Sequence, residues 1–153
     1  MPTLKEQLRS DMTAAMKARD SVRLGTLRMV LTAVSEAEVS GTESQELTDQ
    51  QVLDVVISQA KRRRESEQEY VKAGREDLAA KERAEAEVLA DYLPQQLSSK
   101  EISDLVAEAI ASSGAAELGM RGMGKVMGVL TPQTKGRADG AAVAAEVKRQ
   151  LSA

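Results

Sequence analysis

The sequence predicts an all-α protein, and three observations support that prediction. The 153 residues include only two aromatic side chains, Tyr70 and Tyr92. Ala, Leu, Glu, Lys and Arg are abundant, and these residue types have high helix propensity. Apolar residues recur every three or four positions, and no segment alternates polar and apolar residues as a half-buried strand would. We therefore expect seven helices, four in an N-terminal domain over residues 1–94 and three in a C-terminal tail domain over residues 95–153.

Four amphipathic segments precede Pro94, and capping residues mark where they begin. Thr3 with Glu6 has the pattern of a capping box, in which side chain and backbone satisfy each other's hydrogen bonds at a helix start. Thr48 with Gln51 repeats this pattern. The four helices are expected to begin after Thr3, Asp20 and Thr48 and at Glu76, and to end near Lys17, before Gly41, before Gly74 and before Pro94.

Three further helices are expected in the C-terminal part. Ser98 with Glu101 forms another capping box, and the helix that follows extends to Gly114. The apolar spacing predicts a sixth helix over about 119–130, ended by Pro132. Asp139 then caps a last helix, whose inward residues are Val143, Val147 and Leu151.

The glycines are concentrated between residues 119 and 140, where six of the ten lie. Gly124 and Gly128 are one helical turn apart, although each glycine inside a helix costs about 1 kcal/mol relative to alanine. We interpret the pair as a strip of bare backbone that lets another helix or a polyanion approach closely. Gly136 is a third candidate for close approach, and the alternative for its segment is a turn in which Asp139 caps the last helix.

The net charge of -3 conceals an uneven distribution. Residues 119–153 contain six basic and two acidic residues, a charge of +4, and the remaining 118 residues carry -7. A basic end on an acidic chain favours an anionic partner at that end. Uneven surface charge without a partner is the alternative interpretation.

The absence of cysteine and histidine excludes several kinds of chemistry. There is no thiolate nucleophile, no Cys-ligated metal and no histidine general base. We therefore expect no catalytic residues, no metal and no cofactor. Lys5, Glu6, Arg9 and Asp11 interrupt any apolar segment after Met1, and no segment approaches the ~20 apolar residues that span a bilayer. These features predict a cytoplasmic protein without a membrane partner.

Two motifs suggest nucleotide or nucleic-acid binding but lack the required context. Gly119, Gly124 and Lys125 have P-loop spacing, yet Val126 replaces the hydroxyl residue and no strand precedes the loop. The basic run 61–64 has no interleaved aromatic residue for base stacking. Acidic residues follow it at pairing distance, so Lys61 with Glu65 and Arg63 with Glu67 are expected to form ion pairs along one solvated helix face.

Three segments of the sequence resemble the GatB/YqeY family: 92–98 with 101–102, 123–128 and 135–140. The Gly-Lys-Val-Met-Gly sequence at 124–128 is the most specific of these, and the N-terminal half is similar to free-standing YqeY-like members. The resemblance implies a helical domain followed by a smaller helical tail domain. In the B subunit of the tRNA-dependent amidotransferase, the similar region is attached to a separate catalytic domain and is implicated in tRNA contact.

The resemblance implies a non-catalytic module that binds tRNA or an amidotransferase subunit. Lys125, Lys135 and Arg137 match the family pattern and are the expected RNA contacts; Lys148 and Arg149 are added on charge alone. One alternative is a component of a carbon-nitrogen ligase that uses glutamine as amido-N-donor. The other is a protein-interaction module that does not bind RNA. In none of these do we expect autonomous activity.

Overall fold

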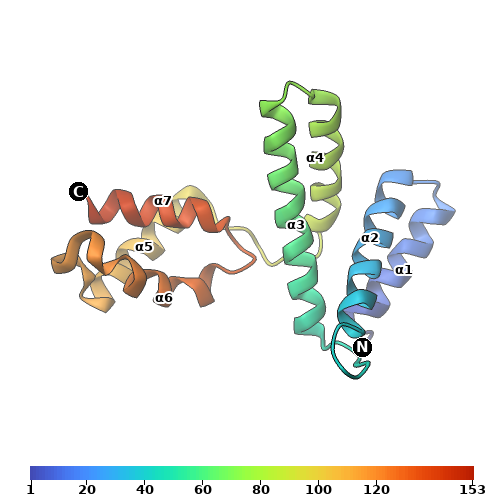
Figure 1. Cartoon of the computed structure of the whole chain (residues 1–153), viewed down its shortest axis with the longest axis horizontal. Helices are drawn as coiled ribbons and strands as arrows, with labels where there is room; N and C mark the ends of the chain where they lie inside the picture. The colour runs from blue at the N-terminus through green and yellow to red at the C-terminus, as the bar shows by residue number, and fades with distance from the viewer. The chain divides into compact units, whose positions relative to one another are not determined.

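The computed structural model describes residues 1–153 and confirms the all-α prediction. It contains seven α-helices, one 3₁₀ helix and no strand (Figure 1). The chain forms two compact units, Met1–Leu93 and Pro94–Ala153. None of the helices is both long enough and apolar enough to cross a membrane.

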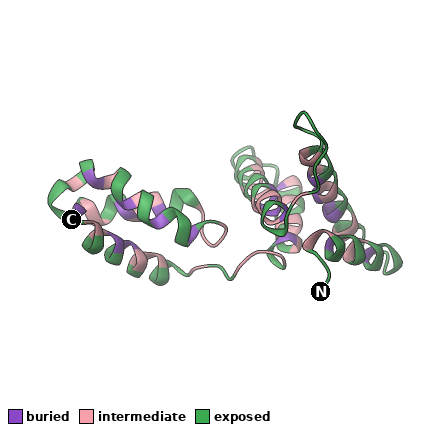
Figure 2. Ribbon diagram, turned by 90° about the horizontal axis from the view of Figure 1, so that it is seen from below, coloured by how far each residue is buried: buried purple, intermediate pink, exposed green.

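The first unit consists of two helical hairpins, α1 with α2 and α3 with α4 (Figure 1). Their bounds are Leu4–Lys17, Ser21–Glu38, Asp49–Lys72 and Glu76–Ala90. All four helices contribute to one apolar core, which forms the purple inner faces in Figure 2. Its buried members are Leu8, Leu27, Val30, Val34, Val52, Val56, Ala60 and Leu89.

The predicted capping boxes are present at three helix starts. Glu6 N–H donates to Thr3 Oγ1 at 3.1 Å, and Thr3 N–H donates to Glu6 Oε2 at 3.0 Å. The same reciprocal pair forms at the starts of α3 and α5. Asp20 caps α2 as predicted, accepting from Arg23 N–H at 3.1 Å. Each cap satisfies backbone donors that the first helical turn leaves without a partner.

Tyr92, which follows α4, forms hydrogen bonds with residues of α1 and α2. Its hydroxyl donates to Asp11 Oδ2 at 2.5 Å and accepts from Arg23 Nη2 at 3.3 Å. Its ring packs against the apolar core. Burial and the Asp11 carboxylate both raise the pKa of Tyr92 above its ordinary value, so the hydroxyl keeps its proton at neutral pH.

Replacing Tyr92 by phenylalanine is expected to lower the free energy of unfolding by about 1–2 kcal/mol, because a half-buried Asp11 loses its donor. Urea unfolding followed by circular dichroism measures the change. The hydroxyl of Tyr70 forms no hydrogen bond, so Tyr70→Phe is the matched control and is expected to be nearly neutral. Equal losses in the two variants would contradict this role for the Tyr92 hydroxyl.

The ion pairs of the α3–α4 hairpin differ in part from the sequence prediction. Lys61 and Glu65 pair within α3 at 3.9 Å, as predicted. The predicted Arg63–Glu67 pair is wrong: Arg63 Nη1 contacts Glu82 and Glu85 of α4, at 3.3 and 3.2 Å. Arg63 lies on the side of α3 that faces its antiparallel neighbour, so carboxylates across the hairpin replace the one on its own helix.

The second unit contains α5 (Ser99–Ser113), the 3₁₀ helix η1 (Ala115–Gly122), α6 (Met123–Thr134) and α7 (Gly140–Leu151). These elements surround their own apolar core. Its buried members are Val106, Ala109, Ala115, Val126, Leu130, Val143 and Val147. Asp139 caps α7, accepting from Ala141 N–H at 3.2 Å.

The sixth predicted helix, 119–130, has both ends in the wrong place. Gly119 has φ 57° and ψ -139°, which interrupts helical geometry, so α6 begins only at Met123. At the other end α6 continues through Pro132 to Thr134. Proline is tolerated there because the carbonyl that it leaves without a helical donor belongs to Gly128, which is exposed and can bind water instead.

Candidate functional site

The candidate site is the solvent-facing side of α6. Gly124, Gly128 and Pro132 are each four residues apart and all exposed, so they form one row along this helix face. A Cβ added at Gly124 or Gly128 would have no neighbour within 4 Å. The second unit therefore does not use these glycines for its own packing. Lys125 and Val129 form the adjacent row and are also exposed.

Two of the predicted RNA contacts have unengaged side chains. Lys125 on α6 and Lys148 on α7 are exposed, and neither forms a hydrogen bond or an ion pair. Such ammonium groups can contact an anion without first breaking an internal bond. Lys125 follows Gly124 directly, which places its charge beside the bare backbone.

Arg137 and Gly136 instead stabilise the second unit internally. Arg137 Nε donates to Gln95 O at 3.2 Å, and Leu97 N–H donates to Arg137 O at 2.8 Å. Gln96 Nε2 donates to Gly136 O at 2.7 Å. Gly136 has φ 74°, a left-handed conformation that favours glycine over other residues. The α6–α7 turn thereby holds the segment that precedes α5; Lys135 is exposed in the same turn.

Arg149 is held by a neighbouring carboxylate on α7. Its Nε donates to both oxygens of Glu146, at 3.0 and 3.1 Å. Hydrogen bonds from Arg149 and then Gln150 lower the pKa of Glu146 to about 2. The folded pKa lies below the unfolded one, so the stability from this contact is present above about pH 4.5 and is lost as the pH falls toward 2.

The positive charge at the C-terminal end is smaller when the whole second unit is counted. The second unit, 94–153, contains seven basic and six acidic residues, a net charge of +1, because α5 and η1 add four acidic residues and one lysine to the basic end. The first unit has fourteen basic and eighteen acidic residues, a net charge of -4. The second unit is therefore close to neutral as a whole, and any attraction for an anion comes from single basic side chains that have no ion-pair partner.

Gly122 has a packing role that its position in the sequence does not indicate. A Cβ at Gly122 would lie 2.8 Å from Ala115 Cβ and 3.0 Å from Ala115 O. The close backbone approach inside the second unit is therefore at Gly122, where η1 folds back on its own start. No local pattern marks it, because the contact depends on the kink at Gly119.

No group of three Asp or Glu residues is placed to hold a metal ion, and the chain has no histidine or cysteine. The face of α6 presents exposed backbone at Gly124 and Gly128 with the Lys125 ammonium group beside it, and another molecule can bind to such a surface.

Comparison with known proteins identifies the family. A sequence profile described as "Yqey-like protein" matches residues 5–151. The chain belongs to the YqeY-like family. One relative, "Altered inheritance of mitochondria protein 41, mitochondrial" of Pyrenophora tritici-repentis, is 32% identical over 134 residues, which cover 86% of this chain and 71% of that protein.

Two further relatives match this chain over shorter stretches. The Kluyveromyces lactis protein of the same name is 34% identical over 85 residues, 56% of this chain and 45% of its own length. An uncharacterized Schizosaccharomyces pombe protein is 32% identical over 99 residues, 64% of this chain and 78% of its own. The chain thus spans from about half to about three quarters of these relatives. Two of the three carry mitochondrial names, and a cytoplasmic location for this chain stays a prediction.

Proposed function

We propose that the second unit is a non-catalytic module that binds tRNA through the exposed face of α6. The observation that supports this most is the Gly124–Gly128 strip, which weakens the helix and has no packing role in the chain. Because the glycine pair costs stability and makes no contact within the chain, we infer that it serves contact with another molecule. The tRNA partner, and an amidotransferase subunit as a companion, follow from the family resemblance.

The geometry suits a phosphate backbone better than base recognition. The strip lets a sugar-phosphate chain come close to α6, and Lys125 beside it supplies the charge. Lys148 provides a second free ammonium group. The unit has no aromatic side chain on which a base could stack. With a net charge of only +1, the binding is expected to be weak and sensitive to salt.

Fluorescence anisotropy with labelled total tRNA at low salt tests the proposal. Lys125→Ala is expected to weaken binding about threefold to tenfold and to reduce the slope of log K against log salt by about 1. Arg149→Ala removes the same charge from a residue already held by Glu146, so it is the matched control and is expected to change little. Equal effects of the two substitutions would show unspecific attraction and contradict the site.

Filling the strip is the second arm of the test. A side chain at Gly128 meets open space, so Gly128→Leu is expected to leave the fold intact while blocking close approach and abolishing tRNA binding. Ala107→Leu, at an exposed position of α5, controls for the added apolar surface. Retained tRNA binding by Gly128→Leu would disprove the role of the strip.

One observation favours a protein partner as the second candidate. Val129, next to the strip, is 37% exposed, and Leu118 and Met120 of η1 are also exposed. An exposed valine beside bare backbone suits the apolar face of a partner helix. A protein captured in a salt-independent manner, and lost in Gly128→Leu, would favour this candidate over RNA.

A further inference from the structure

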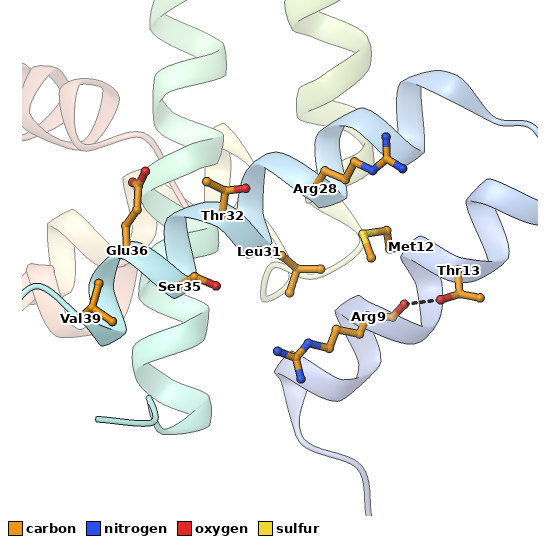
Figure 3. A pocket seen from close by; sticks show the side chains of 9 residues that line it. All are labelled: Arg9, Met12, Thr13, Arg28, Leu31, Thr32, Ser35, Glu36 and Val39. Atoms are coloured by element: carbon orange, nitrogen blue, oxygen red, sulfur yellow. Dashed lines mark hydrogen bonds between the residues drawn. The ribbon is translucent and has the colours of Figure 1, made fainter. Parts of the chain in front are cut away.

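A groove on the first unit is independent of the candidate site. It lies between α1 and α2 and has a volume of about 860 Å³ (Figure 3). Its apolar residues are Met12, Leu31 and Val39, and threonine and serine hydroxyls lie around them. Met12 and Leu31 are half-buried and form the floor; Val39 is 64% exposed. These side chains form a small apolar surface between the two helices, and a partner that bound there would bury it.

Two arginines stand on opposite walls of this groove. Arg9 comes from α1 and Arg28 from α2, with Met12 and Leu31 between them (Figure 3). Both arginines are exposed, and neither guanidinium forms a hydrogen bond or an ion pair. Hydrogen bonds from Lys5 and from the backbone N–H of Leu47 lower the pKa of Glu38, and the charge of Arg9 adds a smaller effect.

We propose that the α1–α2 groove binds an acidic amphipathic helix of a partner protein. The helix would lay its apolar stripe on Met12 and Leu31, which completes a three-helix layer. Carboxylates on its two flanks would pair with Arg9 and Arg28. Guanidinium groups suit this role because they bind carboxylates through two parallel hydrogen bonds.

Charge and shape favour this occupant over the alternatives. A nucleic acid would bring many negative charges to a unit that already carries -4, and Glu36 also lines the groove. A short acidic helix places its charges only at the two arginines. A small ligand is usually enclosed by its pocket, whereas most residues of this groove are exposed to solvent. Amphipathic helices, in contrast, commonly bind in open apolar grooves of this kind.

The experiment uses the full chain and designed peptides of about 18 residues, long enough to form helix. Each peptide has leucines at helical spacing, flanking glutamates and a fluorophore; a second set has lysine in place of each glutamate. Anisotropy is expected to show saturable binding of the acidic set at least tenfold tighter than the basic set. Methyl signals of Met12 and Leu31 are expected to shift in the NMR spectrum of the complex.

Variants assign the binding to the groove. Arg9→Gln and Arg28→Gln are each expected to weaken acidic-peptide binding about threefold to tenfold. Lys17→Gln removes one charge from α1 outside the groove and is expected to change binding less than twofold. No binding by any acidic peptide, equal binding of both peptide sets, or indifference to the arginine variants would each overturn the proposal. Binding of phosphatidylglycerol vesicles through these arginines, without peptide binding, would overturn it in favour of a lipid surface.

Discussion

Replacing Arg63 by leucine is expected to lower the free energy of unfolding by about 3 kcal/mol. Arg63, Glu82 and Glu85 are 17%, 13% and 16% exposed, so two largely buried carboxylates share one guanidinium. Leucine keeps most of the packing volume but leaves both carboxylates without a counter-ion. Removing one partner of a buried ion pair is costly because the remaining charge stays desolvated. Urea unfolding followed by circular dichroism measures the loss.

The pH dependence of that loss identifies its cause. Burial already raises the pKa of Glu82, and the charge of Arg63 opposes the rise. In Arg63→Leu the pKa of Glu82 is expected to rise further. A carboxyl with a raised folded pKa stabilises the fold when protonated, so the variant is expected to recover stability as the pH falls from about 8 to about 5. A loss that is the same at both pH values would point to packing alone.

A second control removes the buried negative charge itself. Glu82→Gln leaves Glu85 paired with Arg63 and removes a carboxyl whose desolvation is not fully offset. It is expected to be neutral or slightly stabilising near neutral pH. A loss above about 2 kcal/mol in Glu82→Gln would mean that the carboxylate contributes net stability, contrary to this account.

Replacing Gly122 by alanine is expected to destabilise the second unit by about 1–3 kcal/mol, through overpacking. The new Cβ would lie 2.8 Å from Ala115 Cβ and 3.0 Å from Ala115 O, and the oxygen is backbone that cannot rotate away. Gly124→Ala is the matched control, because its Cβ meets open space on the exposed face of α6. It is expected to stabilise the helix by up to about 1 kcal/mol. Thermal unfolding of the two variants should therefore shift in opposite directions.

A double substitution tests whether the cost of a side chain at position 122 comes from its collision with Ala115 or from another requirement for glycine. Ala115→Gly removes the methyl group that the new side chain would meet, so Gly122→Ala is expected to cost less in that background. The coupling free energy of the double-mutant cycle measures the steric term. Additive effects would mean that glycine is needed at 122 for another reason.

The helix starts were predictable because capping is local. Thr3, Thr48 and Ser98 lie within three residues of the side chains that complete their caps, so a short stretch of sequence contains the whole interaction. The pairing of Arg63 was not predictable in the same way. Its carboxylates are about twenty residues away in α4, and only the antiparallel hairpin brings them together.

In the candidate site, too, local features were predictable and contacts between distant residues were not. The four-residue spacing of Gly124 and Gly128 predicts a common face, and α6 places them on one. The internal role of Arg137 depends on Gln95, which is 42 residues away along the chain, so the residue type alone does not reveal it. The pair of Arg149 with Glu146 lies within one turn of α7, so its spacing was visible in the sequence. The charge of +4 was counted over residues 119–153 alone, although the predicted tail domain, 95–153, also includes the acidic fifth helix. Over the whole second unit the net charge is +1.

The two units can be observed separately in one unfolding experiment. Tyr70 and Tyr92 both belong to the first unit, and the second contains no tyrosine, tryptophan or phenylalanine. Ultraviolet emission from the natural protein therefore reports on residues 1–93 alone, while helical ellipticity reports on the whole chain. A single tryptophan placed in the second unit would give that unit a fluorescence signal of its own.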